Sequence, residues 1–167
     1  GVAGGLFRGS AEYARRNGRK KVTSLTKSNA QRYGMVLWDR VFREVASMNP
    51  GIRSESKLID AACMDAVRNP GGFDVIVASN LFADIVSDLT AGITGGMGLA
   101  PGGSFNPDDE NAPGLFDPVH GSAPDIAGKG IANPVAAILT SGMMLDYLGE
   151  REAASLLERA VKRQLAD

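Results

Sequence analysis

Two aspartates in the segment FADIVSD, Asp84 and Asp88, have the type and spacing to bind a divalent cation. They lie four residues apart on a predicted helix, so their side chains share one face about 5–6 Å apart. Like charges at that spacing destabilise a helix unless a cation lies between them, and oxygen ligands favour Mg²⁺ or Mn²⁺ over zinc. The alternative is that both are solvated carboxylates near the start of a helix, stabilised by its dipole.

Two further charged residues, Asp60 and Lys27, occupy places where strands and helices are predicted to meet. Asp60 opens a predicted helix and could serve only as its N-cap. Lys27 follows a predicted strand in the string TKSN and could be an ordinary surface lysine. Beside a metal and a substrate, however, a lysine can act as a general base, so the spacing leaves both interpretations open.

A glycine-rich segment, residues 118–134, contains His120, which is the single histidine of the chain. Glycines allow a ligand to approach the backbone closely, and backbone N–H groups can bind phosphate. Asp125 in this segment could accept hydrogen bonds from both hydroxyls of an adenosine ribose and would repel a 2′-phosphate, which favours NAD over NADP. The segment could equally be a set of turns with a structural histidine, and it is not the G-x-G-x-x-G fingerprint.

Hydrophobic periodicity and turn residues predict helices that alternate with short strands, which is typical of the α/β class. One helix has apolar residues at three- and four-residue steps, which form one face: Met35, Trp38, Val41, Phe42, Val45 and Met48. The predicted helices are 6–17, 29–48, 60–69, 81–91, 135–148 and 150–166. The predicted strands are 21–25, 52–59, 73–79 and a short candidate at 115–119.

The composition excludes several classes of protein. Of 167 residues, 44% are hydrophobic and 22% charged, and the net charge is −1, so neither a nucleic acid nor a membrane surface is an expected partner. The single cysteine, Cys63, permits no internal disulfide, which favours a reducing compartment and a cytoplasmic location. The chain has no initiator methionine and starts within a predicted helix, so we expect a piece of a longer protein.

Longer strings connect these residues: TKSN, LIDAACMDAV, FDVIVASNLFADIVSDL, GGMGLAP, and FDPVHGSAPDIAGKGIANP followed by AAILTSGMML. Together they resemble the isocitrate/isopropylmalate dehydrogenase family of β-decarboxylating dehydrogenases along essentially the whole chain. The string HGSAPDIAGKGIANP is the most specific of them. TKSN followed by M-x-x-W, from Met35 to Trp38, is closer to the tartrate/D-malate dehydrogenases of that family.

The resemblance implies a role for each matching position. Lys27 matches the catalytic lysine, Asp84 and Asp88 match two metal ligands, and Asp60 matches a third ligand and catalytic-site residue that reaches the neighbouring subunit's metal in a homodimer. The positions implied to bind the cofactor are Asn29, His120, Gly121, Ser122, Ala123, Pro124, Asp125, Ile126 and Asn133.

The resemblance also implies an architecture and a reaction. The expected fold is an open mixed sheet with flanking helices in two domains: residues 1–94 belong to the smaller, dimer-forming domain and residues 95–167 to the larger one. The implied reaction is NAD- and Mg²⁺- or Mn²⁺-dependent oxidative decarboxylation of a 2-hydroxy acid, of the tartrate/D-malate or 3-isopropylmalate type.

Two departures from the family pattern leave alternatives open. Asp117 stands where the family usually has glutamate, and the half that supplies the substrate-binding arginines and the tyrosine acid is missing. A truncated, non-catalytic fragment that binds metal and nucleotide is therefore a second hypothesis. A metal-dependent hydrolase that shares only the carboxylate helix is a third.

Overall fold

The structure is a computed structural model that describes residues 2–106, 109 and 111–166. The chain divides into two compact units, Gly1–Thr90 and Ala91–Asp167. Helix α4 (Asn80–Ile93) crosses the division, which lies four residues before the boundary expected from the sequence.

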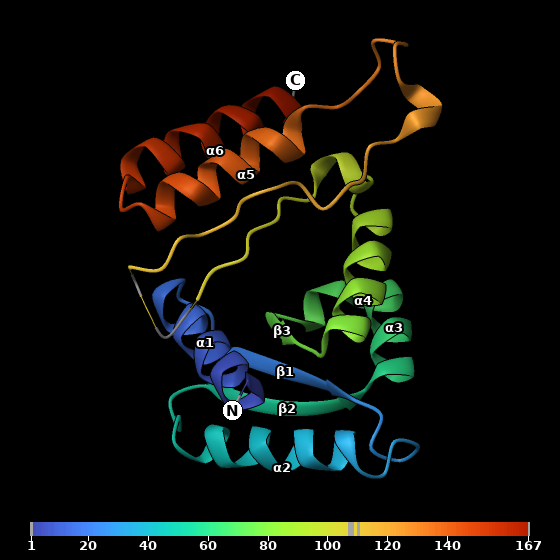
Figure 1. The fold of residues 1–167 in the computed structure, drawn as a ribbon, viewed down its shortest axis with the longest axis vertical. Helices are drawn as coiled ribbons and strands as arrows, with labels where there is room; N and C mark the ends of the chain where they lie inside the picture. The colour runs from blue at the N-terminus through green and yellow to red at the C-terminus, as the bar shows by residue number, and fades with distance from the viewer. Residues whose placement is uncertain (1, 107–108, 110, 167) are drawn as a thin grey trace. The chain divides into compact units, whose positions relative to one another are not determined.

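The first unit is built on three parallel strands in the order β2-β1-β3, which confirms the predicted α/β class. The central strand pairs Thr26 with Leu58 on one side and Ser24 with Val77 on the other, so all three strands end at the same edge of the sheet (Figure 1). In chain order the elements are α1 (Val2–Arg16), β1 (Lys21–Thr26), α2 (Gly34–Ser47), β2 (Arg53–Leu58), α3 (Ile59–Arg68), the short 3-10 helix η1 (Pro70–Gly72), β3 (Val75–Val77) and α4.

Side chains of β1 alternate between two cores on opposite faces of the sheet, as the period of a strand requires. Val22 belongs to the core that contains Phe7 of α1 and Trp38 of α2. Leu25 belongs to a second core with residues of α3 and α4. Helices therefore cover both faces of the sheet, which is why β1 is buried along its whole length.

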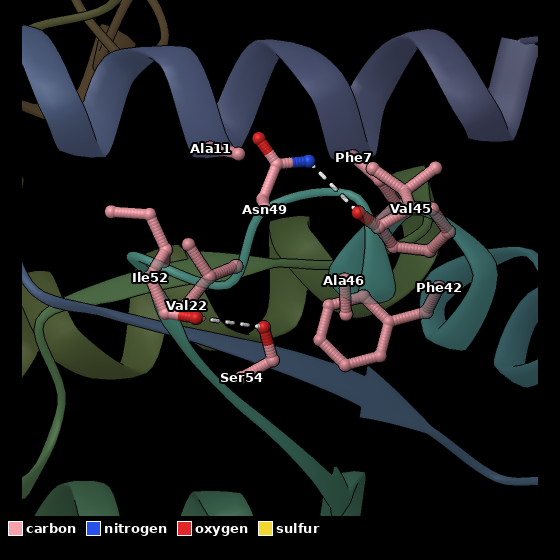
Figure 2. A pocket seen from close by; sticks show the side chains of 9 residues that line it. All are labelled: Phe7, Ala11, Val22, Phe42, Val45, Ala46, Asn49, Ile52 and Ser54. Carbon is pink, nitrogen blue, oxygen red and sulfur yellow. Dashed lines mark hydrogen bonds between the residues drawn. The ribbon is translucent and has the colours of Figure 1, made fainter.

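Aromatic packing holds α1 against α2. The ring of Phe7 lies 4.6 Å from that of Trp38 and 5.1 Å from that of Phe42, in tilted, edge-on arrangements. Trp38 Nε1 donates a hydrogen bond to Ser24 Oγ at 2.9 Å, which satisfies both groups in the core. Figure 2 shows the small apolar cavity beside these rings, where α1 faces the end of α2. Its volume of about 10 Å³ leaves room for one water at most, so it is a packing defect and not a ligand site.

Two predicted elements of this unit are shorter in the structure. The helix expected from residue 29 begins at Gly34, because residues 28–31 form a turn in which the carbonyl of Lys27 accepts the N–H groups of Ala30 and Gln31. Met48, expected on its apolar face, is 67% exposed beyond the helix end. The strand expected over residues 73–79 covers only Val75–Val77, since η1 precedes it and the carbonyl of Ser79 already bonds to the following helix.

The second unit has two packed helices, α5 (Val135–Tyr147) and α6 (Arg151–Ala166), joined by a turn at Gly149 with φ +89° (Figure 1). Two short 3-10 helices, η2 (Met97–Leu99) and η3 (Pro124–Ile126), precede them. The ring of Tyr147 packs against Phe105 and Phe116, and its hydroxyl donates to the carbonyl of Ala112. These contacts attach the irregular segments of this unit to α5.

The strand predicted at residues 115–119 is wrong. Only an isolated antiparallel bridge between Ser104 and Leu115 forms there, with N···O distances of 2.7 and 2.9 Å. The ladder is interrupted at Gly102, whose N–H donates to the Thr140 hydroxyl at 3.3 Å, although the N–H of Val119 still bonds to the Ala100 carbonyl further along. Gly102 lies against the same segment, and a Cβ at this position would approach the Asp117 carbonyl oxygen to 2.3 Å.

In residues 2–106, 109 and 111–166, we find no helix that combines the length and apolar character needed to cross a membrane.

Candidate active site

Lys27 and Asp60 come together at the carboxyl edge of the sheet, where ligand sites of α/β folds gather. Lys27 follows β1, and Asp60 lies in the first turn of α3, directly after β2. Because Thr26 pairs with Leu58 in the parallel ladder, the segments that follow the two strands begin side by side, with Lys27 one residue past β1 and Asp60 two residues past β2. Lys27 Nζ lies 2.8 Å from Asp60 Oδ1, an ion pair between residues that are 33 apart in sequence.

The Lys27 ammonium lowers the pKa of Asp60 through the hydrogen bond that it donates. Backbone N–H groups at the start of α3, those of Asp60 and Ala61, act in the same direction. The Asp60 side chain is 65% exposed, whereas that of Lys27 is 27% exposed. The pair therefore combines an accessible Asp60 carboxylate with a partly sheltered Lys27 ammonium. The carboxylate can contact a ligand without any rearrangement that exposes it.

A turn fixes the backbone that carries Lys27. The Thr26 hydroxyl accepts the N–H of Ser28 at 3.2 Å, and the Lys27 carbonyl accepts two N–H groups from the following turn. Asn29, predicted to lie near the cofactor, is exposed two residues further along. The turn thus presents Lys27 and Asn29 beside the same strand end.

Asp84 and Asp88 both lie on exposed positions of α4, which begins three residues after β3. Neither carboxylate makes a hydrogen bond or an ion pair with any residue in the described part of the chain. Two exposed, unpartnered carboxylates one helical turn apart fit Mg²⁺ or Mn²⁺, which prefer oxygen ligands and retain several waters.

Among the residues that the structure describes, no three His, Cys, Asp or Glu side chains gather closely enough to hold a metal ion. Within one chain, Asp60 therefore does not complete a site with Asp84 and Asp88. The sequence resemblance implies that it serves the neighbouring subunit instead, and this remains a prediction.

Sequence reasoning missed a second ion pair close to Asp60. Lys57, the penultimate residue of β2, contacts Asp65 of α3, with 2.6 Å between Lys57 Nζ and Asp65 Oδ2. A signal was present, because Glu55 and Lys57 alternate along a predicted strand and so share one face. This alternation predicts that one face of the strand is charged, but it does not predict that α3 packs against that face.

The remaining predicted residues lie in the second unit, in the segment from His120 to Asn133. Its backbone is left-handed at three positions, Ala123 (φ +44°), Gly128 (φ +76°) and Gly130 (φ +67°). Only glycine adopts this region without strain, and space is open around both glycines.

The side chains of this segment are largely accessible. Gly121, Ser122, Pro124, Asp125 and Asn133 are exposed, whereas Ala123 and Ile126 are half-buried beside η3. His120 is also exposed, and its Nδ1 lies 3.0 Å from the carbonyl oxygen of Gly121. An exposed carboxylate among glycines with open backbone suits a ribose and phosphate, so the donor set fits the adenosine part of a dinucleotide.

Asn133 connects the segment to the helix that follows. Its Oδ1 accepts the N–H of Val135 at 3.0 Å, which satisfies the first N–H of α5. The sequence pattern predicts Pro134 as the first helical residue, but α5 begins one residue later, at Val135, with Pro134 at the N-cap position.

Comparison with known proteins gives one consistent match. A family model described as "Isocitrate/isopropylmalate dehydrogenase" matches residues 5–167. A 3-isopropylmalate dehydrogenase from Archaeoglobus fulgidus is 51% identical over 162 residues, which are 97% of this chain and 48% of that protein. A protein from Agrobacterium vitis, named as a probable tartrate dehydrogenase/decarboxylase, is 46% identical over 95% of this chain and 44% of its own length.

A solved structure agrees with these relatives. The crystal structure of isocitrate dehydrogenase from Methylococcus capsulatus matches with a TM-score of 0.92 at 45% identity, covering 96% of this chain and 46% of that one. The chain thus spans a little under half the length of the curated relatives it matches.

Proposed function

Because this chain belongs to the isocitrate/isopropylmalate dehydrogenase family, we propose that it is part of an enzyme that oxidises and decarboxylates a 2-hydroxy acid. The proposed cofactors are NAD⁺ and Mg²⁺ or Mn²⁺. The observation that carries the proposal is the Lys27–Asp60 ion pair of 2.8 Å at the carboxyl edge of the sheet. This ion pair brings together Lys27, the candidate general base, and Asp60, a candidate metal ligand, from the ends of two adjacent strands.

The substrate class follows from what the reaction needs. Oxidation at C2 must give a ketone β to a carboxylate, because only then does loss of CO₂ leave a stabilised enolate. The names of the relatives, tartrate dehydrogenase/decarboxylase, 3-isopropylmalate dehydrogenase and homoisocitrate dehydrogenase, describe acids of this kind. We propose a 2-hydroxy dicarboxylic acid for this protein, of the tartrate/D-malate or 3-isopropylmalate type.

Lys27 is proposed as the general base that removes the proton of the substrate hydroxyl. The cofactors would supply Lewis-acid polarisation of that hydroxyl and a hydride acceptor. The Lys27 side chain is mostly sheltered, and its pairing with Asp60 fixes the position of Nζ at the strand ends. A base placed in this way contributes through geometry as well as through proton affinity.

The carboxylates and the glycine-rich segment are proposed to bind the cofactors. Asp84 and Asp88 would hold the cation within one subunit, and Asp60 would reach the cation of its partner in a homodimer. The segment 120–133 would bind the adenosine half of NAD⁺, with Asp125 accepting hydrogen bonds from the ribose hydroxyls.

The test uses the protein made from the complete open reading frame that encodes these residues. NADH formation is followed by absorbance with Mn²⁺ and, in turn, D-malate, tartrate and 3-isopropylmalate. We expect one of them to be oxidised with release of CO₂. Asp84→Asn and Asp88→Asn should each raise the Mn²⁺ concentration required, while Asp146→Asn on α5 should not.

Two negative results have different meanings. If NAD⁺ binds but none of the acids is oxidised, the substrate assignment is wrong. If NAD⁺ does not bind at all, the proposed dehydrogenase function fails.

A further inference from the structure

Helix α3 carries Asp60, and it packs in the second core mainly through small side chains, such as Ala62 and Cys63. It spans only Ile59–Arg68, and its N-cap residue, Leu58, provides no side-chain hydrogen bond. Its buried residues are the small side chains of Ala62 and Ala66. A helix of this length depends on tertiary contacts for its position.

The Lys57–Asp65 ion pair supplies such a contact. Lys57 Nζ lies 2.6 Å from Asp65 Oδ2, and 3.5 Å from Glu55 Oε1 on the same strand. The ammonium also lies 5.3 Å from the centre of the Phe73 ring, within the range of a cation–π contact. The hydrogen bond to Asp65 is the main cause that raises the pKa of Lys57, so the lysine keeps its positive charge. Both side chains are about one third exposed, which gives the contact partial shelter from solvent.

The pair links the active-site edge of the sheet to a second side of α3. In the parallel ladder Lys57 is the partner of Leu25, two residues before Lys27. Asp60 and Asp65 are five residues apart, so they point about 140° from each other around the helix axis. Lys27 and Lys57, from neighbouring strand ends, therefore hold α3 at two separate points.

From this geometry we infer that Lys57 and Asp65 are positioning residues, which fix α3 so that Asp60 keeps its place when it exchanges Lys27 for a metal ion. The inference rests on the proposed role of Asp60 as a metal ligand. In that state the contact of Asp60 with Lys27 no longer anchors the helix, and the Lys57–Asp65 pair remains. Residues that orient metal ligands in this way typically change metal affinity by about 10–100-fold when they are replaced.

The test compares Lys57→Met with the wild-type protein made from the complete reading frame. Mn²⁺ binding is measured by calorimetry without substrate, and kcat and the KM values for Mn²⁺ and NAD⁺ are measured separately. We expect the Kd and KM for Mn²⁺ to rise about tenfold or more, with the KM for NAD⁺ unchanged. Lys57→Arg and the exchanged pair Lys57→Asp/Asp65→Lys should recover most of the affinity. Lys162→Met removes a comparable ion pair of 2.7 Å to Glu158 on α6 and should change nothing.

Amide hydrogen exchange in the metal-free protein separates this inference from the proposed function. Lys57→Met should accelerate exchange in residues 59–68 while α5 keeps its protection. An unchanged Kd for Mn²⁺, or an equal loss in the exchanged pair, would overturn the inference. If the wild-type protein binds no Mn²⁺, the proposed function fails. In that case hydrogen exchange still tests the inference, because unchanged exchange of α3 in Lys57→Met would refute the anchoring role of the pair.

Discussion

Within the part of the chain that the structure describes, the ammonium of Lys27 pairs with Asp60, with 2.8 Å between Nζ and Oδ1, and this contact determines where the Lys27 side chain is held. The contact holds Nζ beside the end of the buried strand β1. The pairing is consistent with a base that is positioned in advance, and it also neutralises Asp60 in the absence of a cation.

We predict that Lys27→Met lowers kcat about 100-fold or more, because general-base catalysis typically contributes 10²–10⁴-fold. The KM for NAD⁺ should change little, since the segment proposed to bind its adenosine half belongs to the other unit and Asn29 is retained. Steady-state kinetics of the protein from the complete reading frame checks this. Lys20→Met, which removes an exposed lysine one residue before β1, is the control. A kcat near the wild-type value in Lys27→Met would remove Lys27 from the mechanism.

At the scale of elements, the beginnings of β1 and β3 are joined by Asp74. Its carboxylate accepts the N–H of Lys20 at 2.6 Å and of Lys21 at 3.1 Å, and Arg19 lies 3.3 Å away. These contacts, above all the Lys20 N–H, lower the pKa of Asp74 from its ordinary value of 3.8. The carboxylate thereby holds together the ends of two strands that lie opposite the candidate active site.

A lowered carboxyl pKa makes stability depend on pH in a defined direction. The folded state binds this proton more weakly than the unfolded state does, so the contribution of Asp74 is complete above the ordinary pKa. It is lost as the pH falls through the lowered folded-state value. We predict that Asp74→Asn lowers Tm at neutral pH and that the difference from wild type shrinks below about pH 4. Thermal unfolding over this range tests it, with the exposed Glu44→Gln of α2 as control. A difference in Tm independent of pH would contradict this role.

The second unit depends on a close backbone approach that involves Gly102. A Cβ there would lie 2.3 Å from the Asp117 carbonyl oxygen, and backbone cannot move aside as a side chain can. The approach fixes the residues just before His120 against residues 100–104. The position at which the segment 120–133 begins is therefore fixed, even though the residues before it form no sheet.

We predict that Gly102→Ala destabilises the protein by about 1–3 kcal/mol, the usual cost of overpacking. Chemical denaturation measures it. Gly92→Ala on α4, where no atom lies within 4 Å of the added Cβ, should be neutral or stabilising. Equal stability of Gly102→Ala and wild type would mean that the two segments separate at little cost.

At the scale of the whole molecule, the candidate residues are divided between the two units. Lys27, Asp60, Asp84 and Asp88 belong to Gly1–Thr90, and the segment 120–133 belongs to Ala91–Asp167. Metal binding and adenosine binding would thus draw on different parts of the chain.

This division predicts separable effects. Asp84→Asn should weaken Mn²⁺ binding and leave the Kd for NAD⁺ unchanged. Asp125→Ser should weaken NAD⁺ binding and reduce its preference over NADP⁺, with Mn²⁺ binding unchanged. Calorimetric titrations of both variants and of the double variant test this. A loss of NAD⁺ binding in Asp84→Asn comparable to that in Asp125→Ser would show that the two sites are not separate.

Local patterns in the sequence determined the class of fold, most of the helices and the family. Helix and strand periods depend on neighbouring residues, so they are readable before the chain folds. The buried face of α2, with Met35, Trp38, Phe42 and Val45, was predicted from spacing alone and is confirmed. The strand at 115–119 failed because pairing depends on a partner, and the available partner is a glycine-rich segment next to a proline.

Tertiary structure alone decided which charged residues meet. The Lys27–Asp60 contact exists because β1 and β2 are adjacent and parallel, in a register that aligns their carboxyl ends. No local pattern encodes strand order, so the sequence around Asp60 alone favoured a simple N-cap. In the structure the N-cap of α3 is Leu58, and Asp60 lies in the first turn of the helix. The Lys57–Asp65 pair shows the same dependence, because the strand pattern reveals a charged face while only packing brings α3 onto it. Asp84 and Asp88 keep the spacing that the sequence gives them, and they remain open to a ligand because the described residues leave both carboxylates exposed.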